Sequence, residues 1–298
     1  MVTLRGVGGR GHRPVVGLGL CVVDHLYRVA EPSAAERTRY RQRLVTTGGM
    51  AANALVQAAA LGVRAQLLSL VGDDADGRWL LRQLRERGVG TRRVVRSAEL
   101  PTTTALILVG ASSGERRFVL PDRRAIERRA PDFDLSPIRR GAVLLVDGHF
   151  ARQAKRALRR AREQGASTIA DFADTRPAFG PLLPLVDYPI VPRQFVESAG
   201  LGSPRDVLRW LRERTGGTPV VTLGRQGALA LVDGRFRRIA ARRVRVRDTT
   251  GAGDAFHGGF AAGLARGMPV LGALELASRA GGQACRSLGA TSSLLTMA

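Results

Sequence analysis

Short apolar runs alternate with longer amphipathic stretches along most of the chain. The runs "PVVGLGLCVVD", "GAVLLVDG", "ASTIADF", "DYPIV" and "TPVVTLG" have the length of buried strands, and "AQLLSLVG" predicts one more. Helical spacing of apolar positions marks "AANALVQAAALG", "ADGRWLLRQLRERG", "ARQAKRALRRAREQG" and "PRDVLRWLRERTG". Strands and helices in turn predict an α/β fold, a three-layer α/β/α sandwich with a mostly parallel central sheet.

Two regions interrupt this alternation, at about residues 26–45 and 102–120. The first is polar and lies between short apolar pieces, whereas the second, "TTTALILVGASSGERRFVL", has two β-rich runs joined by a Gly-rich turn. We expect both to be additions at the edge of the sheet and to form a small β lid over its ligand-binding edge. No repeat or long linker divides the chain, so residues 1–298 are expected to form a single domain.

Composition excludes several classes of protein. A chain of 298 residues that is 44% hydrophobic can bury a full core, and no apolar stretch approaches the length of a membrane span, so we expect a soluble, cytoplasmic protein. Cys21 and Cys285 lie in unrelated segments and predict buried thiols. The net charge of +22 would attract polyanions, but only Lys155 among 47 basic residues is lysine and the arginines are dispersed, which predicts a solvated surface and no nucleic-acid interface.

The stretch "DTTGAGDAFHGGF", Asp248 to Phe260, carries the clearest chemistry. The alternating "RVRVRD" before the glycines predicts a strand. Backbone N–H groups of Gly251, Ala252 and Gly253 would lie at the start of an Ala-rich helix, where the helix dipole favours phosphate. Asp254 follows directly. A carboxylate there either caps the helix or removes the proton from a hydroxyl that attacks a phosphoryl group, and these residues alone leave both roles open.

Three segments together resemble one family. "DTTGAGDAFHGGF" is similar to the C-terminal signature of the ribokinase, or PfkB, family of carbohydrate kinases, and "GGMAANALVQAAALG" with "LVGDDADG" resembles its N-terminal signature. "VVTLGRQGAL" resembles its nucleotide-binding loop, and the similarity extends from about Val15 to Ala290. The resemblance implies a ribokinase-like fold and ATP-dependent phosphorylation of a sugar hydroxyl, with Asp254 as general base and Gly251, Ala252 and Gly253 as the anion hole.

The resemblance also implies substrate-binding residues. Asp24 follows the first strand and matches the sugar-binding aspartate of the family. An ionised carboxylate suits this role, because it can accept hydrogen bonds from two adjacent hydroxyls. Gly48, Gly49 and Asn53 match positions that bind substrate hydroxyls, although Asn53 could instead be a buried polar residue. Met50 stands where many ribose kinases carry lysine, which leaves the sugar open.

At the nucleotide end, Thr222 and Gly224 match the phosphate and ribose contacts of the family. Ser278 lies in "ASRAGGQACRSLGA", which resembles the helix beside the adenine. A plain β-hairpin is the alternative for the segment around Thr222.

The same resemblance implies two metal ions. Asp248 and Thr250 match positions beside a monovalent-cation site, which makes K⁺ a candidate; a turn aspartate and a strand-end threonine are the alternative. In "VPRQFVESAG", Gln194 and Glu197 keep the spacing of a magnesium motif with glutamine in place of asparagine, whereas another register would align Arg193 with Val196. Glu197 is carried over as a water-mediated ligand. Mg²⁺ is expected to bridge the ATP phosphates.

Other functions stay open within this fold. The family includes kinases for nucleosides and for phosphorylated sugars, and Arg116 and Arg117 in "GERRFVL" are candidates for binding an anionic substrate. Outside the class, a non-catalytic sugar or nucleotide sensor and a nucleic-acid-associated protein are the rivals, against which the intact Gly-Ala-Gly-Asp argues. Lid strands in this family often pair between subunits, so a homodimer is expected. His12, His25, His149 and His257 show no metal-ligand spacing.

Overall fold

A sheet of nine strands forms the centre of the computed structural model, which describes residues 12–32, 37–113, 115–122, 124–173, 175 and 179–297. All pairings from β13 to β6 are parallel, and β14 and β15 extend the sheet in antiparallel fashion. In spatial order the strands are β15 (Arg235–Ile239), β14 (Ala228–Val232), β13 (Val220–Thr222), β12 (Tyr188–Pro192), β11 (Ser167–Asp171), β10 (Val143–Val146), β1 (Val15–Leu18), β4 (Ala65–Leu68) and β6 (Val89–Gly90).

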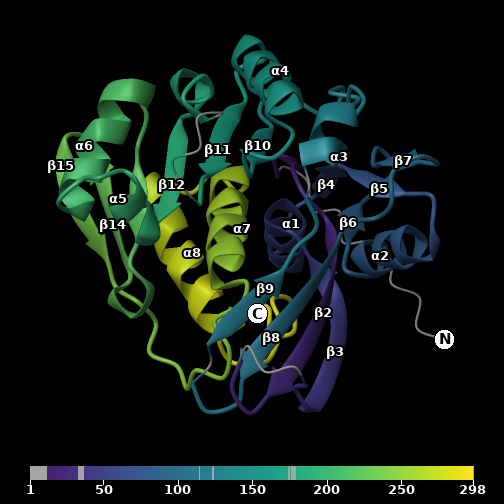
Figure 1. Ribbon diagram of the computed structural model, residues 1–298. Coiled ribbons are helices and arrows are strands. Elements are labelled where there is room, and N and C mark those ends of the chain that lie inside the picture. The colour runs from purple at the N-terminus through teal and green to yellow at the C-terminus, as the bar shows by residue number, and fades with distance from the viewer. Residues whose placement is uncertain are drawn as a thin grey trace.

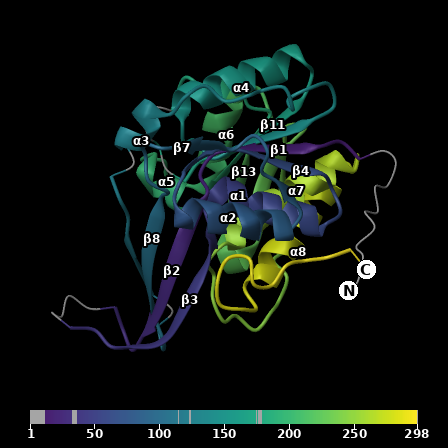
Figure 2. The ribbon, with the colours of Figure 1, turned by 90° about the vertical axis from the view of Figure 1, so that its right-hand side faces the viewer.

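Helices cover both faces of this sheet. Figure 2 shows the sheet between two helical layers, with α4 and α6 on one side and α1, α2, α7 and α8 on the other. The predicted three-layer α/β/α fold is therefore confirmed. The helices are α1 (Met50–Ala60), α2 (Ala75–Glu86), α3 (Arg124–Arg129), α4 (Ala151–Glu163), α5 (Gln194–Ser198), α6 (Pro204–Thr215), α7 (Ala252–Ala265) and α8 (Val270–Ala284), and the 3₁₀ turns are η2 (Leu183–Leu185) and η3 (Gly224–Gln226).

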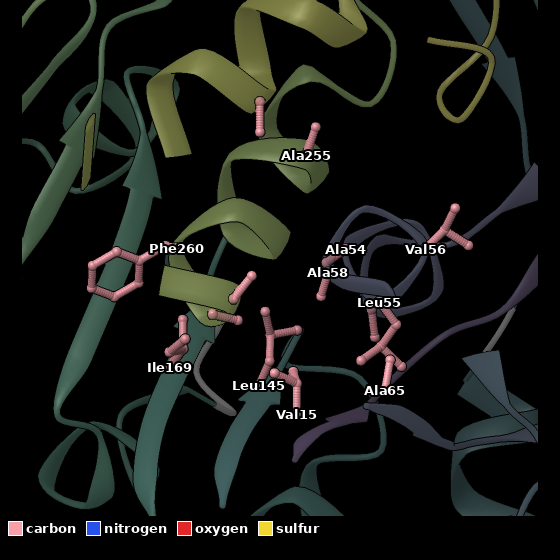
Figure 3. Close-up of a cluster of buried hydrophobic side chains, with 14 of the residues drawn as sticks. Val15, Ala54, Leu55, Val56, Ala58, Ala65, Leu145, Ile169, Ala255 and Phe260 are labelled. Carbon is pink, nitrogen blue, oxygen red and sulfur yellow. The ribbon is translucent and has the colours of Figure 1, made fainter. Parts of the chain in front are cut away.

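Alternate side chains of the central strands enter two apolar cores. Val15, Leu145 and Ile169 point towards α1 and α7, where Leu55 and Phe260 are fully buried (Figure 3). The intervening side chains of the same strands point into the second core, beneath α4 and α6. Strands buried on both faces explain the continuous apolar runs in the sequence.

A second, four-stranded sheet lies beside the central one (Figure 1). Its order is β3 (Tyr40–Gly48), β2 (Val22–Val29), β8 (Thr104–Gly110) and β9 (Arg116–Val119). The predicted hairpin of residues 102–120 corresponds to β8 and β9, and the segment 26–45 contributes half of β2 and most of β3; residues 33–36 and 114 lie outside the described part of the chain. These four strands are called the lid sheet below.

The structure differs from the sequence-based expectations at three places. The lid strands form a sheet of their own and do not extend the edge of the central sheet. "AQLLSLVG" is divided at Ser69 into β4 and β5 (Leu70–Gly72), and β5 pairs with β7 (Val95–Ser97) in a separate sheet. The alternating "RVRVRD" before Gly251 forms no strand, because Arg247 donates its backbone N–H to Cys285 O at the end of α8 and not to a strand.

No helix in the described residues is long and apolar enough to cross a bilayer. This finding agrees with the hydropathy of the sequence.

The closest helix contact provides a test of the fold. A Cβ at Gly258 of α7 would lie 2.1 Å from Ala54 O of α1, so Gly258→Ala must force the two helices apart. We expect this variant to lose about 1–3 kcal/mol of unfolding free energy in urea denaturation. The matched control is Gly202→Ala, where the nearest atom lies 3.7 Å away in an exposed bend and stability should be unchanged. Equal stability of the two variants would contradict the close packing.

Candidate active site

The candidate site begins at the N-terminus of α7. Gly251 is the N-cap residue with a φ of 74°, a left-handed conformation, and a Cβ there would lie 2.4 Å from the Ala290 Cβ. Only glycine fits this turn. The first backbone N–H groups of a helix lack partners inside the helix, so this end can bind an anion. The Ala252 N–H, which was expected to face the anion, donates to Thr249 O at 3.2 Å in this structure.

Asp254 lies in the first turn of α7 and is held by a residue from α1. Asn53 Nδ2 donates a hydrogen bond of 2.7 Å to Asp254 Oδ2, and the Asn53 side chain is buried. Two residues that are 201 positions apart in the chain thus meet at one point. Asn53 Oδ1 is buried without a hydrogen-bond partner in the described structure, which leaves an acceptor free for a ligand hydroxyl.

Asp24 on β2 lies close to this pair and shares its electrostatic environment. Burial and the charge of Asp254 raise the pKa of Asp24 to about 7. A Cβ at Gly48 would lie 2.2 Å from Asp24 Oδ2, so the absence of a side chain at Gly48 makes room for this carboxylate. Gly49 has a φ of 93° and forms the N-cap of α1. The structure therefore brings together all four residues that were matched to substrate binding.

Burial also raises the pKa of Asp254 to about 7, and the charge of Asp171 adds to this effect. The hydrogen bond from Asn53 acts in the opposite direction. A base that titrates near neutral pH is well matched to proton abstraction, because it is ionised at working pH and still holds a proton firmly. Asp254 also places a negative charge in the first turn of α7, where the helix dipole favours it.

Three further polar residues surround Asp254 that the sequence patterns did not reveal. Asp171 ends β11, and burial together with the charge of Asp147 raises its pKa to about 8. His257 Nδ1 lies 2.8 Å from Gly253 O and 3.3 Å from Asp171 Oδ2, and burial lowers the pKa of this imidazole. Asp147 follows β10 and accepts hydrogen bonds from the backbone N–H groups of Leu20 and Ala51. The only sequence signal for the two aspartates was their position at the carboxyl ends of parallel strands.

A cavity of about 500 Å³ opens on the other side of the α7 terminus. It brings together Thr222, Gly224 and Ser278, the residues matched to nucleotide binding, with Ala252 and Gly253 of the helix start. Thr222 ends β13, and Gly224 begins the turn that leads to the antiparallel strand β14, as the strand–turn–strand pattern predicted. The lining is mainly apolar, so the cavity suits a planar base.

Arginine is abundant around this cavity. Arg225, Arg242 and Arg243 line it, together with Val244 and Val246 of the "RVRVRD" segment that was predicted to be a strand. Positive charge at the mouth of a cavity attracts polyphosphates.

Asp248 is buried beside the anion site and takes three hydrogen bonds. Its Oδ1 accepts from Thr250 N (2.8 Å) and Thr250 Oγ1 (2.7 Å), and its Oδ2 accepts from Gly289 N (2.8 Å). A carboxylate offers about four acceptor positions, so Asp248 retains room for a bound cation. Oxygen donors of this kind suit a hard cation, and Asp248 is the residue that would hold K⁺.

Glu197 lies apart from these groups. Its side chain is exposed on α5, just after the carboxyl end of β12, and it does not line the 500 Å³ cavity. No group of three or more Asp, Glu, His or Cys side chains in the described residues could hold a metal ion alone. An exposed carboxylate at this edge fits a magnesium ion that keeps most of its water and takes its other ligands from phosphates.

Comparison with known proteins gives a consistent result. Residues 14–297 match the model of the pfkB family carbohydrate kinases. Mouse ribokinase is 28% identical over 93% of this chain and 89% of its own length, and the aminoimidazole riboside kinase of Salmonella typhimurium is 29% identical over 74% of both chains. A crystal structure from Agrobacterium tumefaciens, assigned as a ribokinase, superposes with a TM-score of 0.87 at 28% identity over 96% of this chain and 95% of that chain.

The raised pKa of Asp254 predicts that the stability difference between the Asp254→Asn variant and the parent chain depends on pH. The folded carboxyl holds its proton up to about pH 7, whereas the unfolded one ionises near its ordinary pKa, so this stabilising contribution is lost as the pH rises through about 7. Asp254→Asn does not titrate. Its unfolding free energy relative to the parent chain should therefore increase between about pH 5 and about pH 8 in urea denaturation.

The control for this experiment is Asp76→Asn, which alters an exposed carboxylate in the first turn of α2. Its stability difference from the parent chain should stay constant over the same pH range. A constant difference for Asp254→Asn as well would show that the Asp254 carboxyl titrates alike in the folded and unfolded chain.

Proposed function

The chain belongs to the pfkB family of carbohydrate kinases, and from this premise we propose that it transfers the γ-phosphoryl group of ATP to a hydroxyl of a sugar or sugar-like substrate. The observation that supports this most directly is the position of Asp254. It lies between the acceptor residues Asn53 and Asp24 on one side and the cavity with Gly253 on the other.

The proposed roles follow from the chemistry of each group. The carboxylate of Asp24 and the free Oδ1 of Asn53 accept hydrogen bonds from substrate hydroxyls. Asp254 removes the proton of the attacking hydroxyl, and the N-terminus of α7 at Gly251–Gly253 stabilises charge on the migrating phosphoryl group. The lid sheet would exclude water, which could otherwise accept the phosphoryl group.

ATP would occupy the cavity lined by Thr222, Gly224 and Ser278. Magnesium would neutralise charge on the phosphates when bound, with Glu197 reaching it through water. A monovalent cation held by Asp248 would offset the negative charge of that buried carboxylate next to the anion site. Because ATP is the donor, we place the reaction in the cytoplasm.

The acceptor is proposed as a pentose-like or hexose-like sugar, with nucleosides as the second candidate. Relatives of this chain include a ribokinase and an aminoimidazole riboside kinase, which supports both. An ADP-release assay over ribose, ketohexoses, hexose phosphates, deoxy-keto acids and nucleosides, with and without K⁺, would identify the acceptor class. Absence of ADP release with every acceptor would favour a binding protein instead.

A homodimer through the lid sheet is also proposed. The lid exposes large apolar side chains, which a partner lid would cover. They are Tyr40, Leu106, Phe118 and Val119.

Removal of the base is the sharpest test of the mechanism. With an accepted sugar, Asp254→Asn should lower kcat by about 10²–10⁴-fold, because the proton of the attacking hydroxyl has no acceptor. ATP binding measured by calorimetry should persist. The kcat of the parent enzyme should rise with pH through about 7, since only the ionised form of Asp254 accepts a proton. Turnover of Asp254→Asn at the parent rate would refute the assignment.

A second variant separates acceptor binding from chemistry. Asp24→Asn keeps the size of the side chain but weakens its hydrogen bonds to hydroxyls, so KM for the sugar should rise about tenfold while KM for ATP is unchanged. A selective rise in KM for ATP would instead place Asp24 at the nucleotide.

A further inference from the structure

Four arginines meet at the amino-terminal edge of the central sheet. Three segments of the chain supply them, because one directly precedes β4, two follow the turn after β6, and one lies shortly before β10. The carboxyl ends of the same sheet carry the candidate active site, so this cluster lies at the opposite edge. We call its members the edge arginines: Arg64, Arg92, Arg93 and Arg139.

Two adjoining cavities bring the edge arginines together. The larger, of about 340 Å³, is lined by Arg64, Arg92 and Arg93, and the smaller, of about 100 Å³, is lined by Arg64, Arg93 and Arg139. Since Arg64 and Arg93 border both cavities, one elongated ligand can reach all four guanidinium groups. We propose that the two cavities form a binding site for an oligophosphate anion, a class that includes pyrophosphate and tripolyphosphate.

Polar neighbours hold two of the edge arginines in place. Arg93 Nε donates to Asp134 Oδ2 at 2.6 Å and to Ser136 Oγ at 3.2 Å. With the Gln66 amide oriented so that its oxygen faces the guanidinium, that oxygen accepts from Arg64 Nε at 3.3 Å and from Arg64 Nη2 at 3.1 Å. Both Nη groups of Arg93 and Nη1 of Arg64 remain for an anion. Because these side chains are already held, binding costs them less conformational freedom.

The cluster carries more positive charge than its surroundings neutralise. Among the described residues, Asp134 is the only carboxylate within ion-pair distance of an edge arginine. Arg92 and Arg139 are exposed and form no ion pair with any described residue. Four like charges around two small cavities repel one another, and an anion with several negative charges would relieve that repulsion.

The lining favours a ligand that is recognised by its charge. The larger cavity has no aromatic side chain among its described lining residues on which a base could stack; besides the arginines it is bordered by Ala65, Gln66, Leu67, Gly88 and Gly90. Each guanidinium presents N–H donors in a planar fork that matches phosphate oxygens. Two or more linked phosphates would place charge in both cavities, whereas a single phosphate would occupy only one.

This site is separate from the proposed kinase site. Arg139 precedes β10 and Asp147 follows it, so the two sites lie at opposite ends of one strand. The two cavities share no lining residue with the 500 Å³ cavity, so an oligophosphate here would not compete with ATP. A ligand that joins three segments of the chain should also stabilise the folded state.

Calorimetric titration with tripolyphosphate tests the proposal, with AMP-PNP and magnesium kept at saturation so that the nucleotide cavity is occupied. The parent chain should bind one further tripolyphosphate. Arg64→Gln and Arg139→Gln should each weaken this binding about 10–100-fold, as for the loss of a charge-assisted hydrogen bond. Inorganic phosphate should bind at least about tenfold more weakly than tripolyphosphate, because it reaches fewer of the guanidinium groups.

The matched control is Arg159→Gln, which removes the same charge from an exposed position on α4 that lines neither cavity. Its affinity for tripolyphosphate should equal that of the parent chain. ADP release by Arg64→Gln with an accepted sugar should also be unchanged. Equal weakening in Arg159→Gln would show a diffuse effect of net charge and overturn the site. Absence of a further binding event in the parent chain, or equal affinities for phosphate and tripolyphosphate, would overturn it as well.

Discussion

The close contact between α1 and α7 is the constraint on which the candidate site depends. Where the helices meet, Gly258 leaves no room for a Cβ against Ala54 O, so the two backbones touch directly. This approach allows Asn53 to reach Asp254 with a hydrogen bond of 2.7 Å. The N-terminus of α1 follows the two glycines beside Asp24, and the N-terminus of α7 borders the cavity. One helix contact thus sets the residues proposed to bind the acceptor against the glycine turn proposed to bind phosphate.

The candidate site is acidic, although the protein as a whole is strongly basic. A chain with a net charge of +22 concentrates Asp24, Asp147, Asp171 and Asp254 around the start of α7. Burial and mutual repulsion raise the pKa of three of them to between about 7 and 8. Such a cluster costs stability, and it gives Asp254 the affinity for protons that a base near neutral pH requires. The arginines that line the cavity supply the opposite charge where the phosphates of a nucleotide would lie.

Sequence reasoning was most successful where the chemistry is local. The glycine turn, Asp254 and the loop at Thr222 and Gly224 are encoded by contiguous residues, because each depends on backbone conformation within one turn. Asp171 and His257 could not be found in this way, since a strand end and a helix interior carry no motif until the sheet brings them together. The error at "RVRVRD" has a physical cause as well. Alternation of valine with arginine is typical of an edge strand, but here the segment packs against α8 and lines the cavity.

The proposed site is divided between α7 and the lid sheet. Hydrolysis of ATP is the side reaction that any such enzyme must suppress, and a complete anion site that is always present would promote it. In this structure α7 carries the glycine turn and Asp254, the proposed base, whereas the lid sheet carries Asp24. The parts share no strand, and contacts such as that between Arg116 and Thr250 join them. An acceptor that bridges the two parts would therefore assemble the site as it binds, which makes binding energy available for specificity.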